Sequence, residues 1–349
     1  MLRFKQVILS SRVIQFLFGL LLFLFLSETW LNYTSLNATT AFTELCLHQE
    51  KLSEKAQYTV SILLEKANNA DCEIAGRNLA KLEQLDLSAT AIEDLTPLSS
   101  FQRLTELYLA DNEISDITPL SSLKRIEKLE LSNNNISNIT PLSNMKKLDT
   151  LWMWNNQVSN LKPLFELTNM THLYLPFNKI SIINPIASLN KLEVIIFDNN
   201  RITDISTLSN LRNLQGISLL HNNIKDISSL ENLDKLKVFI AGDNQIHDLS
   251  PLSKLTKLSL LILDKNFVNN ITPLSNLFNL EKVYLSYNNI IDITPLSNLK
   301  KLSKLQLNNN KIQDISPLNL LTQITSIDIS NNPLYNFNCP IKPDSICKF

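Results

Sequence analysis

Residues 107–128 read LYLADNEISDITPLSSLKRIEK, and residues 283–304 read VYLSYNNIIDITPLSNLKKLSK, which is the same 22-residue pattern further along the chain. Written from its first leucine, the unit is LxxLxLxxNxIxxIxPLxxLxx. Eleven regular units are followed by an altered copy that begins at Ile324. The regular units begin at Leu82, Leu104, Ile126, Leu148, Met170, Leu192, Leu214, Leu236, Leu258, Leu280 and Leu302. A strict period of this length predicts a solenoid, with function on a long repeated surface rather than in an enclosed pocket.

The composition of the 349-residue chain fits one continuous core and gives no sign of a charged ligand. Hydrophobic residues make up 44% of the chain, which is enough for the core of a solenoid that grows linearly. The formal net charge is −1, from 32 basic and 33 acidic residues, and gives no argument for nucleic acid or an anionic membrane. Only 4 glycines are present, which argues against glycine-rich phosphate loops.

The first 26 residues differ in kind from the rest. Three basic residues precede an apolar run over residues 13–26, which suits a signal-peptide core and is short for a membrane span of about 20 residues. The segment predicts export. Because no clean cleavage site follows Leu26, an uncleaved amino-terminal anchor stays open, and the chain is expected in the periplasm, secreted, or anchored to a membrane by this segment alone. Residues 27–40 predict a polar spacer.

The four cysteines of the chain lie outside the repeats, two at each end. They are Cys46, Cys72, Cys339 and Cys347. In an exported chain, this arrangement predicts one disulfide at each end. Of the three pairings, only Cys46–Cys72 with Cys339–Cys347 avoids a link across the whole array. The histidines do not cluster in sequence with these cysteines, so we expect no metal site.

Each unit is predicted to begin with a short strand. Positions 4 and 6 of the unit are apolar and alternate as in a strand with one buried face, as Leu107 and Leu109 do. One such strand cannot bury its face alone, so the units predict a parallel sheet with one strand per coil. Position 9 is asparagine in eleven of the twelve units and Thr90 in the first. A buried asparagine at this turn can both donate to and accept from the backbone, so we interpret the series as structural.

The second half of each unit predicts a helical turn on the opposite side. Position 16 is proline in nine of the eleven regular units, with Thr207 and Ser229 as the exceptions. A threonine or serine usually precedes the proline, as in Thr118–Pro119, which predicts a hydroxyl N-cap with proline at the first helical position. Because only six residues remain before the next strand, we expect a short 3-10 segment and a slim convex side.

Both ends of the array need covers, because an open coil exposes its core. Residues 41–81 predict a helical cap, with a first helix near residues 42–49, an amphipathic helix capped by Ser53 and a short helix that begins at Asp71. Residues 82–323 hold the eleven regular units. Residues 324–349 predict a terminal repeat and cap, in which two prolines end regular structure and the last disulfide closes a small loop over the final coil.

The period, the xDITPLSNL half-unit and the flanking helical cap resemble the internalin-type branch of bacterial leucine-rich-repeat proteins. The resemblance covers residues 82 to about 338. The cysteine-bearing ends resemble exported, cyanobacterial-looking members more than listerial ones, and we expect no immunoglobulin-like domain, sorting motif or wall-binding module after the repeats. The resemblance implies an α/β solenoid, a leucine-rich-repeat horseshoe with a parallel concave sheet and short 3-10 segments on its convex side. It also implies binding of a protein or glycan through that sheet, without catalysis or a cofactor.

Positions 3, 5 and 7 of each unit are expected to line the concave face. They are polar at both ends of the array and aromatic or aliphatic in the middle, an arrangement typical of a binding site with a polar margin. Trp152 and Trp154 share one face and suit a binding hot spot. The alternative is that these side chains stabilise exposed strands by lateral packing. The predicted ligand-binding residues are Tyr108, Trp152, Trp154, His172, Tyr174, Phe177, Ile196, Ile240, Ile262 and Tyr284.

Among the classes of function, the sequence favours an exported protein that binds a protein ligand, with a glycan as the second kind of ligand. An enzyme needs a nucleophile, a base and an orienting group that converge. His172, Asp198 and His221 are expected in neighbouring parts of the concave face, but no activated serine or cysteine accompanies them, so we predict no catalytic residue. The alternative function is a structural envelope or periplasmic spacer without a specific ligand, which predicts an inert concave face.

Overall fold

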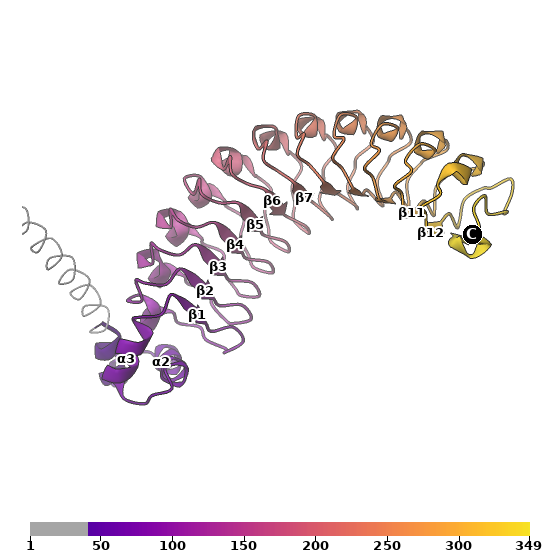
Figure 1. Cartoon of the computed structure of the whole chain (residues 1–349). Coiled ribbons are helices and arrows are strands. Elements are labelled where there is room, and N and C mark those ends of the chain that lie inside the picture. The colour runs from indigo at the N-terminus through magenta and orange to yellow at the C-terminus, as the bar shows by residue number, and fades with distance from the viewer. Residues whose placement is uncertain (1–40) are drawn as a thin grey trace, which may run out of the picture.

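The computed structural model describes residues 41–349, so the predicted export segment and the polar spacer lie outside the described residues. The described chain forms an arc of stacked coils, with the strands along the inner side and the short helical turns along the outer side (Figure 1). The strands form one 13-stranded sheet in the order of the chain, and neighbouring strands are parallel. This is the solenoid with a parallel concave sheet that the repeat predicts.

Each of the first twelve strands holds three residues, and each pairs with the next strand in a shift of 22 residues, as Leu85 does with Leu107. The register therefore places the same position of successive units side by side across the whole sheet. The strands are β1 (Gln84–Asp86), β2 (Glu106–Tyr108), β3 (Lys128–Glu130), β4 (Thr150–Trp152), β5 (His172–Tyr174), β6 (Val194–Ile196), β7 (Gly216–Ser218), β8 (Val238–Ile240), β9 (Leu260–Ile262), β10 (Lys282–Tyr284), β11 (Lys304–Gln306) and β12 (Ser326–Asp328).

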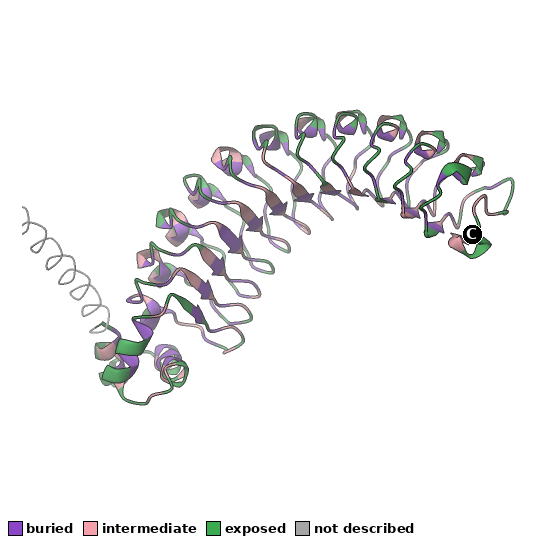
Figure 2. Ribbon diagram, in the orientation of Figure 1, coloured by how far each residue is buried: buried purple, intermediate pink, exposed green. Residues whose placement is uncertain are grey.

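The core runs without a break along the inside of the coils (Figure 2). The middle residue of each strand points inward, and so does the residue two positions later. In the second unit these residues are Leu107 and Leu109, and both are completely buried. The apolar residues of the convex turns close the core from the other side, as Ile117 and Leu120 do in the second unit. Burial of one such side chain contributes about 1.5–3 kcal/mol, and every coil repeats the arrangement.

The asparagine at position 9 has the role that the sequence predicts. In the fifth unit, Nδ2 of Asn178 donates to the carbonyl oxygen of Met153 in the preceding coil at 2.8 Å and to that of Leu175 in its own coil at 3.2 Å. Its Oδ1 accepts from the backbone N–H of Val158 at 2.9 Å. In the first unit, the hydroxyl of Thr90 donates to the carbonyl oxygen of Leu87 at 2.7 Å. The buried amide thus joins each coil to the one before it.

The convex turns are 3-10 segments, as expected, but the predicted hydroxyl N-cap is wrong. In the second unit, Thr118 is the first helical residue and Pro119 the second, and the carboxylate of Asp116 accepts from the N–H of Thr118 at 2.8 Å. A side-chain carboxylate or amide that accepts from the N–H two residues later closes an Asx turn. The hydroxyl of Thr118 lies inside the helical segment and does not make this bond. The segments are η2 (Thr96–Leu98), η3 (Thr118–Ser122), η4 (Thr140–Asn144), η5 (Lys162–Leu164), η6 (Asn184–Ser188), η7 (Ser206–Asn210), η8 (Ser228–Leu230), η9 (Ser250–Leu252), η10 (Thr272–Leu274), η11 (Thr294–Leu296) and η12 (Ser316–Leu320).

A helical cap covers the first coil, as predicted. Residues 41–47 are helical and are followed by η1 (Gln49–Lys51), α2 (Glu54–Lys66) and α3 (Cys72–Leu79). The hydroxyl of Ser53 accepts from the N–H of Ala56 at the start of α2. The carboxylate of Asp71 caps α3 in the same manner.

Packing and a hydrogen bond fix the cap to the array, and a disulfide joins two helices within the cap. The buried ring of Phe42 lies 5.6 Å from the buried ring of Phe101 in the first repeat. The hydroxyl of Thr59 on α2 donates to the carbonyl oxygen of Asp94 at 2.7 Å. The disulfide joins Cys46 in the first helix to Cys72 in α3, which is the predicted pairing.

The C-terminal end continues the sheet, which the sequence did not predict. After Pro343 the chain forms η13 (Asp344–Ile346) and then β13 (Cys347–Lys348), a thirteenth strand that pairs with β12. The expectation that the prolines end regular structure here is therefore wrong. The disulfide between Cys339 and Cys347 fixes this strand to the preceding loop.

Candidate binding surface on the concave side

The apolar residues at position 5 of the units form two groups on the concave sheet rather than one continuous stripe. Ser218 on β7, which is buried, separates the two groups, and Glu130 on β3 separates Tyr108 from the first. Members of each group are direct neighbours in the register of the sheet. The first group is Trp152, Tyr174 and Ile196, and the second is Ile240, Ile262 and Tyr284.

The rings at the centre of the first group are held in a fixed arrangement. The rings of Trp152 and Tyr174 stack with centroids 5.8 Å apart and an angle of 4° between their planes. The imidazole of His172 lies 6.1 Å from the ring of Tyr174, and its Nδ1 is 2.7 Å from the hydroxyl of Thr171. Stacking therefore covers part of each ring and leaves the rest toward solvent.

Trp154 extends this surface beyond the end of β4. Its side chain is 40% exposed, although tryptophan is among the residues that gain most from burial. The backbone of Trp154 is fixed to the preceding coil, since its N–H donates to the hydroxyl of Ser132 at 3.1 Å. Its carbonyl oxygen accepts from the N–H of Asn133 at 2.8 Å. We name Trp152, Trp154 and Tyr174 the concave aromatic patch.

Phe177 lies on the rim of the sheet, just after β5, and its backbone conformation is uncommon for an aromatic residue. Position 8 of every unit has a positive φ, and seven of the twelve units have the asparagine or aspartate that tolerates it best. Phe177 has φ 53° and is 55% exposed. Tyr287 has φ 56° and is 52% exposed. Tyr287 is not among the residues predicted from the sequence, although an aromatic side chain at a position that favours asparagine is a signal for it.

Two half-buried carboxylates, those of Asp198 and Asp264, lie on the concave side, three units apart. Burial raises the pKa of the carboxyl groups of Asp198 and Asp264 above the usual aspartate range, against the hydrogen bonds that they accept. Oδ1 of Asp198 accepts from the hydroxyl of Ser218 at 2.6 Å and from the N–H of Leu220 at 2.8 Å. Oδ1 of Asp264 accepts from the N–H of Ser286 at 2.7 Å. Both carboxylates therefore join neighbouring coils.

The structure does not support the conceivable catalytic pairing of His172 or His221 with Asp198. His221 Nδ1 is 2.7 Å from the carboxylate of Asp243 instead, and Lys265 lies 4.0 Å from the same carboxylate. Oδ1 of Asp198 instead accepts the hydrogen bonds from Ser218 at the end of β7 and from Leu220 two residues later. His221, Asp243 and Lys265 form an exposed cluster on the rim of the sheet, apart from Asp198.

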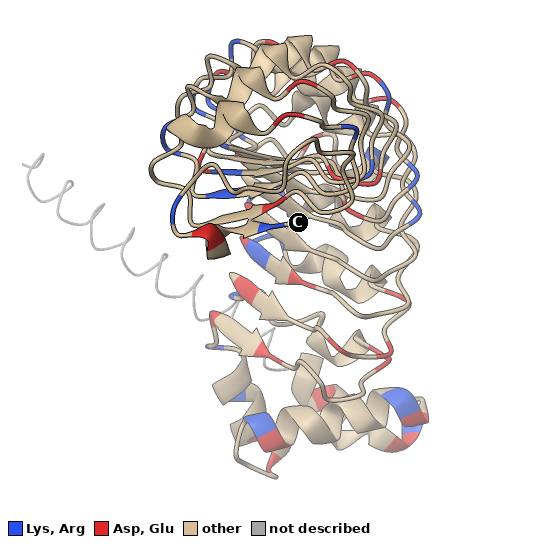
Figure 3. Ribbon diagram, turned by 90° about the vertical axis from the view of Figure 1, so that its right-hand side faces the viewer, with Lys and Arg blue, Asp and Glu red and all other residues tan. Residues whose placement is uncertain are grey.

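Charges of both signs are interspersed over the coils (Figure 3). Within residues 41–349, no group of three or more histidine, cysteine, aspartate or glutamate side chains is arranged to hold a metal ion. A search of the same residues finds no helix with the length and hydrophobicity needed to cross a membrane.

Comparison with known proteins agrees with this geometry. A family model described as "Leucine Rich repeats (2 copies)" matches residues 80–124, 102–144, 124–166, 168–210, 212–253 and 278–320. A search of curated protein sequences finds no match.

Several solved structures share the fold. An internalin (InlF) from Listeria monocytogenes is 26% identical, with 83% of this chain and 93% of that chain covered and a TM-score of 0.74. The plant peptide hormone receptor RGFR1, solved in complex with RGF2, is 20% identical over 73% of this chain and 48% of the receptor chain, with a TM-score of 0.62. The functional domain of InlJ from Listeria monocytogenes is 20% identical over 75% and 70%, with a TM-score of 0.55. The last two likenesses show the fold alone.

Proposed function

Because the chain belongs to the leucine-rich-repeat family, we propose that it is an exported protein that recognises a protein ligand through its concave face. Proteins of this repeat type are typically protein-binding and usually non-catalytic. The observation that carries the proposal is the concave aromatic patch. In this patch Trp154 is 40% exposed, on a face whose outward side chains do not form part of the core. Exposed tryptophan and tyrosine side chains on a preorganised surface are typical hot spots for protein binding.

The two disulfides support a location outside the cytoplasm. Disulfides such as Cys46–Cys72 and Cys339–Cys347 persist in oxidising compartments and are rare in reducing ones. The basic and then apolar segment over residues 1–26 gives a route to such a compartment. Export, with or without cleavage of that segment, is therefore part of the proposal.

The ring geometry favours a protein over a glycan as the ligand. A sugar ring binds best on the open face of an aromatic ring. In the patch, the parallel rings of Trp152 and Tyr174, with centroids 5.8 Å apart, cover part of one face of each other, which leaves less open face for a sugar ring. Apolar and polar side chains of a protein can pack against the parts of these rings that remain accessible. The structure of RGFR1 with RGF2 offers a precedent for a ligand of this chemical class on a related solenoid.

The test uses the purified chain as bait in extracts of the envelope and the culture medium of the source cells. Wild type and a Trp152→Ala/Trp154→Ala variant are compared by quantitative mass spectrometry, and both are applied to a glycan array. We expect a protein that wild type retains and the variant loses. Equal recovery by both baits, or signals confined to the glycan array, would reject the proposal, and equal recovery would favour the inert spacer.

A further inference from the structure

The repeats of the chain can be compared with one another on the convex side, and the fourth and fifth units depart from the rest. Position 13 is aspartate or asparagine in ten of the eleven regular units, and in each its Oδ1 accepts from the N–H two residues later. Ile182 replaces it in the fifth unit. Position 15 is threonine or serine except at Lys162 and Asn184, and position 18, most often serine, is Phe165 in the fourth unit.

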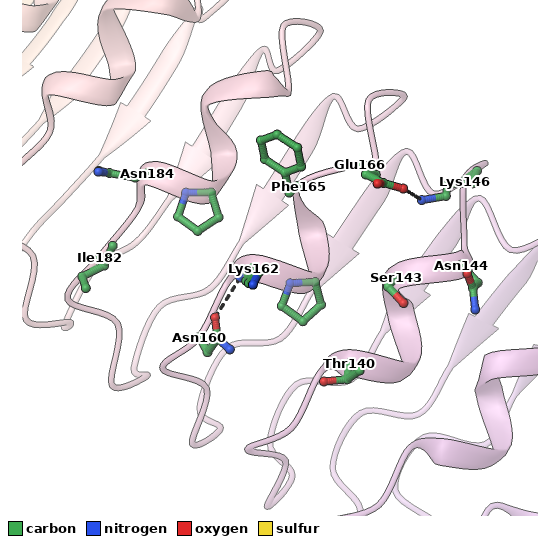
Figure 4. A pocket seen from close by; sticks show the side chains of 12 residues that line it. Thr140, Ser143, Asn144, Lys146, Asn160, Lys162, Phe165, Glu166, Ile182 and Asn184 are labelled. Atoms are coloured by element: carbon green, nitrogen blue, oxygen red, sulfur yellow. Dashed lines mark hydrogen bonds and ion pairs between the residues drawn. The ribbon is translucent and has the colours of Figure 1, made fainter.

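These departures gather around one hollow in the convex surface. Its cavity volume is about 840 Å³, and it extends over the turns η4, η5 and η6. Phe165 and Ile182 come from neighbouring coils, and Lys162 and Asn184 line the same hollow (Figure 4). Two prolines complete the apolar part of the lining, Pro163 and Pro185.

The apolar side chains at this hollow have no role in the core. Phe165 is 51% exposed and Ile182 is 62% exposed. Ile182 also lacks the oxygen with which its counterparts cap the next turn, so the substitution gives up a hydrogen bond and exposes an apolar side chain. Single exposed apolar residues need no explanation, but several gathered at one hollow are typical of an interaction surface.

The charges at the hollow are complementary to an acidic ligand. Lys146 and Glu166 pair with each other at 2.6 Å. Lys162 makes no ion pair with any residue of the described chain. The other regular units have an uncharged residue at its position, which is threonine, serine or asparagine. The lining therefore offers one uncompensated ammonium group beside an apolar surface.

We propose that this hollow docks an acidic segment of a partner protein, with an apolar side chain between Phe165 and Ile182 and a carboxylate on Lys162. The site lies on the opposite side of the same coils that carry the concave aromatic patch, so the two surfaces can be occupied independently. The fourth and fifth units would then join two partners, one on each side of the solenoid.

The test is a selection with a phage-displayed library of random dodecapeptides on three immobilised forms of the chain. The first is wild type. The second is Phe165→Ser/Ile182→Asp, which restores the residues of the other units: the new aspartate regains the turn cap, and the new serine can bond the turn as Ser253 does at 2.8 Å. This variant should therefore fold and unfold at the same or a higher midpoint. The third is Trp152→Ala/Trp154→Ala, which leaves the hollow intact.

We expect peptides with aspartate or glutamate next to an apolar residue to be enriched on the first and third forms and not on the second. A synthetic peptide of the enriched sequence should bind Phe165→Ser/Ile182→Asp at least about tenfold more weakly than wild type. Lys162→Thr should weaken binding and remove its dependence on salt. Enrichment that is equal on all three forms, or that lacks acidic residues, would overturn the proposal. So would concentration-dependent self-association that the double variant abolishes, which would assign the hollow to a second copy of the chain. None of these outcomes depends on the concave ligand.

Discussion

At the scale of single residues, the buried asparagine of each unit is the polar link between coils. Asn222 donates to the carbonyl oxygens of Phe197 and Leu219 at 3.0 and 3.1 Å and accepts from the N–H of Ile202 at 2.9 Å. Removal of its amide leaves three buried backbone groups without this partner. Buried backbone groups left in this state are costly, because water cannot replace the lost bond.

Asn222→Ala is therefore expected to lower the free energy of unfolding by at least about 2 kcal/mol. Asn223→Ala is the matched control, since Asn223 is the next residue, is exposed and has the same side chain. Its effect should stay within about 0.5 kcal/mol. Denaturant unfolding followed by circular dichroism measures both. Equal losses for the two variants would show that the series of asparagines is not what joins the coils.

The two half-buried carboxylates predict how stability changes with pH. Burial holds the folded-state pKa of Asp198 and Asp264 above the unfolded value, so the folded chain binds these protons more tightly. For each carboxyl group, the free energy of unfolding should then decrease as the pH rises from the unfolded-state pKa to the folded-state pKa. Asp198→Asn/Asp264→Asn keeps the accepting oxygens and removes the charge, so it should be more stable than wild type at neutral pH. Unfolding measured from about pH 3 to about pH 7 should show the two proteins converge toward the acidic end. A difference that widens as the pH falls would contradict this assignment.

At the scale of elements, the N-terminal cap depends on its disulfide and on its packing over the first coil. The bridge between Cys46 and Cys72 joins residues 26 apart and restricts the unfolded cap. Each coil packs only on its neighbours, so the effect of the bridge should stay near that end of the array.

Cys46→Ser/Cys72→Ser is expected to destabilise the cap by about 2–4 kcal/mol. Hydrogen exchange should then speed up in α2, α3 and the first coils and stay unchanged near β8. The C-terminal bridge joins residues only 8 apart, so Cys339→Ser/Cys347→Ser should have a smaller effect, confined to the last coils. A non-reducing digest that links Cys46 to either C-terminal cysteine would refute the pairing itself.

The elements also show where sequence reasoning was sufficient and where it was not. The periodicity alone predicts the strands, the 3-10 turns and the asparagine links, because identical units stack in register. A hydroxyl before proline usually caps a helix, so the sequence predicts Thr118 and its counterparts as the caps of the turns. In the structure, the aspartate two residues earlier caps the turn instead. The thirteenth strand could not be predicted, because the last residues no longer follow the repeat and Cys347 pairs with Ile327 of β12 outside the shift of 22 residues.

At the scale of the whole molecule, the sequence predicted which residues lie on the concave face but not how their rings pack. Alternation predicts which side chains leave the core, and Trp152, Tyr174 and Ile196 do lie side by side. The interruption at Ser218 can be read from position 5 of the units, whereas the stacking angle of the rings depends on side-chain packing that periodicity does not encode. The convex hollow needs three successive turns to form, so no single unit shows it.

The central claim is that the concave aromatic patch binds a protein and does not serve the fold. The control residue is Leu151, the inward neighbour of Trp152 on β4, which is fully buried. Leu151→Ala should lower the free energy of unfolding by about 2–5 kcal/mol, because it leaves a cavity in the core. Trp154→Ala removes no core contact, so its unfolding should stay close to that of wild type.

The most direct measurement uses the protein that wild type retains and the Trp152→Ala/Trp154→Ala bait does not. Its affinity is measured for wild type, Trp154→Ala and Leu151→Ala, together with the unfolding midpoint of each form. We expect Trp154→Ala to weaken binding at least about tenfold with an unchanged midpoint. We expect Leu151→Ala to lower the midpoint and, while folded, to keep the affinity. If Trp154→Ala instead lowers the midpoint as much as Leu151→Ala and binds as tightly as wild type, the patch is lateral packing and not a binding site.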